Sequence, residues 1–198
     1  VIGELAFSDL RFTKLPLTLT TWGDWLEKNP ETKVLDIDTG FDRNYRNLNK
    51  RGSAYYDYFN SPDWMFPTFH TNEVLGLKDR VLALVFDDFP KAYALEALQE
   101  SPVVNDTVGG QELVITFNPI PEAARLYERG GHDFLPTQDP DVVLDEDGAE
   151  WRVEETGLVK SDGTETLIRL PGHVSYWFGW VAFHPDTELF GEIVTGAE

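Results

Sequence analysis

The sequence contains no cysteine, which excludes a disulfide framework, a thiolate nucleophile and a zinc–thiolate site. Basic residues are few: 16 Lys and Arg stand against 35 Asp and Glu, for a formal net charge of −19. This charge repels nucleic-acid backbones, so we expect no nucleic-acid partner. The longest apolar runs, RVLALVF and YWFGWVAF, are too short to cross a bilayer, so we expect no direct membrane insertion. The chain also lacks a Gly-x-Ser-x-Gly elbow and a His-Glu-x-x-His motif.

Apolar residues make up 41% of the chain and aromatic residues 13%, which is enough for a large core at this length. Short runs rich in Val, Leu and Ile predict many strands, and Asp147-Gly148 and Asp162-Gly163 are typical hairpin turns. The expected fold class is α+β, mostly antiparallel β with a few short helices. Strands are predicted at 33–38, 79–86, 112–117, 124–129, 142–145, 150–159, 164–170 and 188–194.

One pattern occurs twice: TTWGDWLEKNPETKVLD near the start corresponds to SYWFGWVAFHPDTELFG near the end. Each pattern predicts a two-turn helix that a proline ends, followed by a strand. We therefore predict an internal duplication. The matched residues, each pair 155 positions apart, are Trp22 and Trp177, Trp25 and Trp180, Pro30 and Pro185, and Thr32 and Thr187.

The two helices should resemble each other in their caps and in their burial. Thr21 followed by Asp24 resembles a capping box, and Ser175 is expected to open the second helix. Trp at positions i and i+3 places both indoles on one face, and YWFGWVAF is apolar all round. We therefore expect the tryptophans to be structural core residues, with a carbohydrate or peptide platform as the alternative. They are Trp22, Trp25, Trp177 and Trp180.

If each helix-strand unit closes one repeat, the chain holds one complete copy preceded by the tail of another. Residues 1–40 would be that tail, 41–78 an aromatic-rich connecting loop with short helical turns, and 79–198 the complete β-rich repeat. We expect the chain to be a fragment, a processed product, or a chain whose other half lies beside it in an assembly.

The segment VVNDTVGGQELVITFNPIPEAARLYER, together with KAYALEAL, DTGFDRNY and the two Trp segments, resembles the prokaryotic family catalogued as domain of unknown function 3179. Since members of that family look secreted or lipid-anchored, the resemblance implies an extracytoplasmic location. It implies no activity. The family's Tyr-Cys-Pro-Leu-Cys segment and its preceding histidine are replaced here by Asn118, Pro121 and Ser101, which implies a copy without that chemistry.

The acidic stretch DIDTGFDRNY is a candidate metal site. Asp36, Asp38 and Asp42 supply the hard oxygen ligands that calcium prefers, although the glycine and the closing Glu of an EF-hand are missing. The alternative is a turn in which these carboxylates accept hydrogen bonds from backbone amides or pair with Arg43 and Arg46. Beyond this possible calcium ion, no cofactor is expected.

VNDTVGG indicates a hairpin turn more than a phosphate loop, because no Lys-Ser/Thr pair follows Gly109 and Gly110. Asn105, Asp106 and Thr107 are nevertheless candidate ligand-binding residues if they face a cleft.

The histidines have no metal-ligand spacing. His184 is expected to cap the second helix, whereas His132 and His173 are candidate ligand-binding residues if they meet in space.

Three functional hypotheses follow. The first is a non-catalytic extracytoplasmic module that binds another protein chain, or its own N-terminal half, as an interaction or assembly subunit. The second is a hydrolase or metal-dependent enzyme that uses the Asp cluster or the histidines. The third is a carbohydrate- or peptide-binding module, in which aromatic residues between Tyr55 and Phe69 stack on the ligand.

Overall fold

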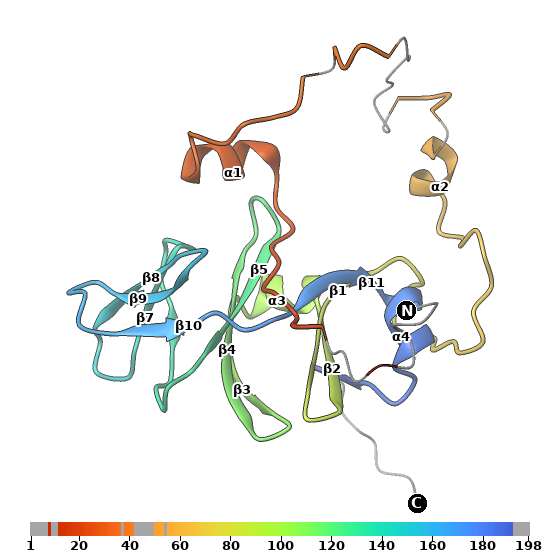
Figure 1. The fold of residues 1–198 in the computed structure, drawn as a ribbon. Coiled ribbons are helices and arrows are strands. Elements are labelled where there is room, and N and C mark those ends of the chain that lie inside the picture. Colours follow the sequence, from red (N-terminus) through yellow and green to blue (C-terminus); the bar gives the residue numbers. More distant parts are fainter. Residues whose placement is uncertain (1–7, 9–11, 37, 42–49, 54, 192–198) are drawn as a thin grey trace, which may run out of the picture.

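The computed structural model describes residue 8 and residues 12–36, 38–41, 50–53 and 55–191. The strands in this part of the chain form three sheets (Figure 1). The predicted fold class is confirmed, because the structure is β-rich and mostly antiparallel with a few short helices. The duplication stays a prediction. None of the helices in the described part is both long enough and apolar enough to traverse a membrane.

The first sheet has the strand order β11-β1-β2-β12, in which only the β12–β2 pair is parallel. The second, β3-β4-β5, and the third, β10-β9-β8-β7-β6, are antiparallel. The strands are β1 (Arg80–Phe86), β2 (Phe89–Ala94), β3 (Val103–Val108), β4 (Gln111–Asn118), β5 (Ala123–Glu128), β6 (Leu135–Pro136), β7 (Val142–Leu144), β8 (Glu150–Val153), β9 (Gly157–Lys160), β10 (Thr166–Ile168), β11 (His173–Tyr176) and β12 (Glu188–Leu189). The helices are α1 (Trp22–Lys28), α2 (Tyr56–Asn60), α3 (Leu95–Glu100) and α4 (Trp177–Phe183).

Strand β4 lies between two buried clusters of apolar side chains, so both of its faces are buried. Leu113 and Ile115 pack into a cluster with residues of β1, β2 and β5, while Val114 between them packs on the other side with Tyr127 and Trp151. Alternate residues of a strand point to opposite faces. A continuous apolar run therefore fits a strand between two layers, and LVITF is such a run.

Several predicted strands differ from the observed ones. Residues 33–36 and 38 form no strand, and 150–159 is divided into β8 and β9 by a bend at Glu155 and Thr156. The predicted strand at 188–194 is limited to β12 within the described residues, and 192–194 lie outside them. The VNDTV part of VNDTVGG is strand β3, so the turn comprises only the two glycines.

The Gly109-Gly110 turn touches the turn between β1 and β2. A Cβ on Gly109 would lie 2.3 Å from the carbonyl oxygen of Phe86, and Gly109 has φ +56°. Asp87 and Asp88 in the opposing turn also have positive φ, +48° and +65°. Close approach of the two backbones, rather than phosphate binding, accounts for the glycine at position 109.

Helix α1 and the segment before it are fixed to the sheets by polar contacts. The Thr18 hydroxyl donates to Glu155 Oε2 over 3.0 Å, and this carboxylate pairs with the buried Arg125 (Nε to Oε1, 2.7 Å) and Arg169. Lys28 Nζ lies 2.9 Å from Asp141 Oδ2. These contacts hold residues 12–28 against the second and third sheets, and thereby position one wall of the pocket described below.

Candidate functional site

Two of the three candidate residues of VNDTVGG, Asn105 and Asp106, make contacts that hold the fold together. The Asn105 amide exchanges two hydrogen bonds with the Phe134 backbone, over 2.8 and 2.9 Å. Asp106 Oδ2 accepts from the Tyr93 hydroxyl over 2.6 Å and lies 3.0 Å from Lys91 Nζ. Burial opposes the charge on Asp106, but these partners outweigh it and lower its pKa. Asp106 therefore joins the first sheet to the second, and Thr107 is exposed beside it.

His132 and His173 lie in different surroundings and do not form one site. The His132 ring packs against Phe134 and Trp151, and its nitrogens lie 3.3 Å from Glu146 and 3.5 Å from Glu165. His173 is on β11, against Trp180. A ligand that needs both imidazoles has no site here.

In the acidic stretch, the carboxylates of Asp36 and Asp38 accept hydrogen bonds from the backbone N–H groups of Asp38 (3.0 Å) and Gly40 (3.4 Å). Such hydrogen bonds from backbone amides to Asp side chains are those expected for a turn, which was the alternative to a calcium site. Asp42 lies outside the described residues. No group of three or more metal-ligating side chains occurs among the residues that the structure describes.

Asn118, Pro121 and Ser101 were singled out by the family resemblance, and two of them line a cavity beside α1. Asn118 and Pro121 face Asp24, Lys28 and Asp141 across about 470 Å³. The Asn118 side chain accepts a hydrogen bond from the Ile120 N–H over 3.1 Å. Ser101 follows α3 as its C-cap.

Helix α4 covers the face of the first sheet that is turned away from the main core. Trp177, Trp180 and Val181 pack with Leu189 of β12 against small side chains of β1 and β2, namely Val81, Ala83 and Ala92. The indole N–H of Trp177 donates to the Asn72 carbonyl over 3.0 Å. Ser175 does not cap the helix, because the N-cap residue is Tyr176 and it makes no side-chain cap bond.

Helix α1 repeats the local geometry of α4. The C-cap residues Asn29 and His184 have φ,ψ of −134°,65° and −134°,69°, and each donates its backbone N–H to the Trp four residues before it. Trp25 donates its indole N–H to Thr32 over 2.9 Å, as Trp180 does to Thr187 over 2.8 Å. The predicted cap is present at the start of α1, where Thr21 accepts from the Asp24 N–H.

The surroundings of the two helices differ, and the expectation that Trp22 and Trp25 are core residues is wrong, because α1 has no buried residue and Trp25 is only half-buried. Trp22 is 52% exposed and Leu26 38%, whereas their counterparts Trp177 and Val181 are 1% exposed. Val34 and Leu35, after the helix, are 69% and 86% exposed. The polar face of α1, with Asp24 and Lys28, is the one that contacts the body of the protein. The apolar side chains of this helix and of the segment after it are here called the α1 face, namely Trp22, the half-buried Trp25, Leu26, Val34 and Leu35.

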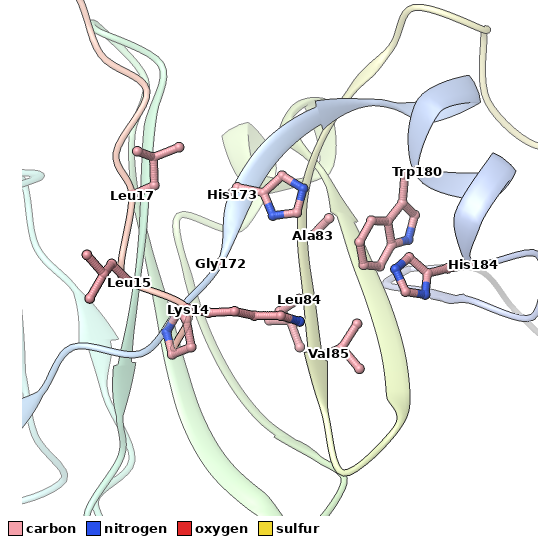
Figure 2. A pocket seen from close by; sticks show the side chains of 11 residues that line it. Lys14, Leu15, Leu17, Ala83, Leu84, Val85, Gly172, His173, Trp180 and His184 are labelled. Atoms are coloured by element: carbon pink, nitrogen blue, oxygen red, sulfur yellow. The ribbon is translucent and has the colours of Figure 1, made fainter. Parts of the chain in front are cut away.

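A pocket of about 380 Å³ lies where the segment before α1 passes β1 and β11. Figure 2 shows the Lys14 side chain extending into the pocket toward Leu84, below His173 in this view. The Trp180 ring forms one wall, with its centroid 5.9 Å from that of His173 and 4.0 Å from that of His184. The remaining lining residues are Leu15, Leu17, Ala83, Leu84, Val85, Pro171 and Gly172.

The electrostatics of this pocket are set by three groups. Partial burial lowers the pKa of both imidazoles, and the Lys14 charge lowers both further. His173 adds to the effect on His184. At neutral pH both rings are therefore neutral, so that each has one N–H donor, and Lys14 is the only full charge in the lining.

The sequence analysis singled out two residues of this pocket, His173 and His184, but it did not predict that they line one pocket. His184 ends α4 as expected, since it is the C-cap residue, yet its ring also lines the pocket. Lys14 was missed because KLPLTLTT carries no motif, and only the path of the chain across β1 brings it near the histidines.

The fold and these sites define a β-rich α+β module with one exposed apolar helix face and a pocket of small-molecule size. Residues 1–187 match the model of the family described as "Protein of unknown function (DUF3179)", and the chain belongs to this family. No curated protein and no solved structure matches the chain.

Proposed function

We propose that this chain is a non-catalytic, extracytoplasmic interaction module that binds another polypeptide through the α1 face. The observation that carries the proposal is the match between the two helix units. The side chains that α4 and β12 bury are Trp177, Trp180, Val181 and Leu189, and the α1 unit has an apolar residue at each corresponding position, namely Trp22, Trp25, Leu26 and Val34.

The partner that fits the α1 face is a polypeptide presenting an antiparallel hairpin of the β1–β2 kind. Such a hairpin offers small side chains like Val81, Ala83 and Ala92, against which two indoles can pack. Its free edge could pair with Val34 and Leu35 as β2 pairs in parallel with β12, where the Phe190 N–H also donates to the Ala92 carbonyl. The hairpin of a second copy is covered by its own α4, so the partner is a different segment of chain.

Two further features support interaction over catalysis. The polar candidates Asn105, Asp106 and His132 are engaged in contacts that hold the fold together. Large exposed apolar side chains also occur elsewhere in the described chain, at Phe41, Phe66 and Phe69.

A graft tests whether α1 suits a sheet of this kind. Residues 177–187 are replaced by the sequence of residues 22–32, which keeps both Trp, Pro and Thr in place. We expect one cooperative unfolding transition, with a loss of no more than about 2 kcal/mol in the free energy of unfolding. The control is the same graft with Trp177→Ala, which should lose about 3–5 kcal/mol more. A graft that unfolds as early as its control, or that does not fold, contradicts the proposal.

A further inference from the structure

We propose that the pocket between Lys14, His173, Trp180 and His184 binds a small organic carboxylate that carries an apolar group. The proposal concerns a site separate from the α1 face and does not depend on the proposed function. It rests on the composition of the lining, on the placement of the three nitrogen-bearing groups, and on the volume.

The lining lacks acidic residues in a chain that is rich in them. None of the 11 residues around the pocket is Asp or Glu, although the chain has 35 of these among 198 residues. Two of the four histidines and one of the few basic residues are present instead. In a protein with net charge −19 this is a local region where an anion meets no repelling carboxylate.

Lys14 is available to a ligand. Among the described residues it makes no ion pair, whereas Lys28, Lys91 and Lys160 each pair with a carboxylate. Its side chain extends into the pocket (Figure 2). An ammonium group so placed can donate charge-assisted hydrogen bonds to a carboxylate, which are about twice as strong as bonds between neutral groups.

The histidines add donors without adding charge at neutral pH. Because each neutral imidazole has one N–H, both rings can donate to the same anion. With Lys14 as the single full charge, the pocket matches a monoanion better than a dianionic phosphate.

The rest of the lining selects for an apolar group beside the carboxylate. Trp180 supplies an aromatic wall that is itself held by its hydrogen bond to Thr187 (2.8 Å), and Leu15, Leu17 and Val85 supply aliphatic surface. The volume of about 380 Å³ is at the lower end of the range for ligand pockets. A small molecule fits this space.

Titration calorimetry on the full chain tests the inference. The probes are acetate, hexanoate, phenylacetate and indole-3-acetate, with phenylacetamide as the uncharged match of phenylacetate and inorganic phosphate as the dianion. We expect hexanoate or one of the aromatic acids to bind at least tenfold more tightly than acetate and phosphate. Phenylacetamide should bind at least tenfold more weakly than phenylacetate. If none of the carboxylates binds at millimolar concentration, or if the amide binds as well as the acid, the inference is wrong.

Variants locate the binding to this pocket. Lys14→Met keeps the length of the side chain and removes its charge, and it should weaken carboxylate binding at least tenfold. Lys33→Met makes the same change at an exposed position outside the lining and should leave binding unchanged. His184→Asn places the Asn29 side chain of α1 at the same C-cap position, so α4 should persist while binding falls severalfold. Thermal unfolding of each variant reports its folding, and equal binding by Lys14→Met and the unmodified chain would overturn the assignment.

Discussion

Trp180 donates its indole N–H to the hydroxyl oxygen of Thr187 over 2.8 Å, and thereby closes the turn that follows α4. Trp180 is only 4% exposed, so water cannot readily replace this acceptor. The same bond in α1, from Trp25 to Thr32, lies in a helix without buried residues.

We therefore expect Thr187→Val to lower the free energy of unfolding by about 1–3 kcal/mol, because it leaves a buried N–H without a partner. Thr32→Val should cost less than about 1 kcal/mol, since the Trp25 indole can turn to water. Urea unfolding at neutral pH measures both variants. Equal losses would mean that the two Trp environments do not differ as described.

A second pair of variants compares corresponding positions of α1 and α4, namely Leu26→Glu and Val181→Glu. Leu26 is exposed and its counterpart Val181 is buried. Leu26→Glu should change the free energy of unfolding by no more than about 0.5 kcal/mol, while Val181→Glu should destabilise the protein by several kcal/mol because it buries a carboxylate without a partner. The binding of a hydrophobic dye to the folded chain should fall in Leu26→Glu. An unchanged dye signal would contradict an exposed apolar face at this position.

The pocket histidines give a prediction for pH. Their pKa values lie below the ordinary value of 6.5, so the folded state disfavours their protonation. The corresponding stability is present above about pH 6.5 and is lost as pH falls below it. In the Lys14→Met variant the pKa values of His173 and His184 should rise, because a neighbouring charge is gone. The imidazole proton shifts in NMR spectra follow both titrations. Unchanged pKa values of His173 and His184 in the variant would mean that the Lys14 charge does not act on these rings.

A bound carboxylate should act on the same titrations in the opposite sense. Phenylacetate places negative charge beside both rings, so it should raise their pKa values, and by linkage its affinity should rise as pH falls from about 8 to about 5.5. Calorimetry across this range measures the affinity. Affinity that is flat or that falls on acidification would show that the anion does not approach the imidazoles.

Asp145 gives a prediction for acid stability. Its carboxylate accepts from the Trp151 indole over 2.9 Å and from the Ala149 N–H over 2.8 Å, and it lies 3.4 Å from Lys160 Nζ. The Trp151 bond is the largest of the causes that lower its pKa to about 2. Because the unfolded value is near 3.9, Asp145 contributes roughly 2 kcal/mol above about pH 4, and this is lost as pH falls toward 2.

Asp145→Asn keeps the shape and removes the charge, so it should destabilise the protein by about 1–3 kcal/mol at neutral pH. The difference from the unmodified chain should shrink near pH 2.5. The exposed neighbour Asp147 provides the control, and Asp147→Asn should have little effect at either pH. Urea unfolding at the two pH values measures these free energies. If Asp145→Asn loses the same free energy of unfolding at both pH values, the charge of Asp145 does not stabilise the fold.

The fold class followed from the sequence because it depends on short-range patterns. The run LVITF in β4 and the Asp-Gly turns are read correctly from neighbouring residues alone. Strand β2 was missed because FPKAYA contains a proline and a lysine, although Lys91 is buried through its pairing with Asp106. Such long-range compensation leaves no local signal.

The candidate site was predicted less well, for a similar reason. The Trp22 and Trp177 segments carry the same apolar pattern, and that pattern cannot tell a helix face covered by its own chain from one that is open. Lys14 and His184 are 170 positions apart, and their proximity depends on the anchoring of the preceding segment through Thr18 and Glu155.

The contact between Gly109 and the Phe86 carbonyl has a practical consequence for engineering. Two hairpin tips that meet backbone to backbone leave no room for an inserted epitope, tag or fluorophore, and extra residues in either tip would push the first two sheets apart. The Asp162-Gly163 tip is different, because nothing lies within 4 Å of where a side chain on Gly163 would begin. A reporter group is best carried there, where it leaves both the α1 face and the Lys14 pocket free.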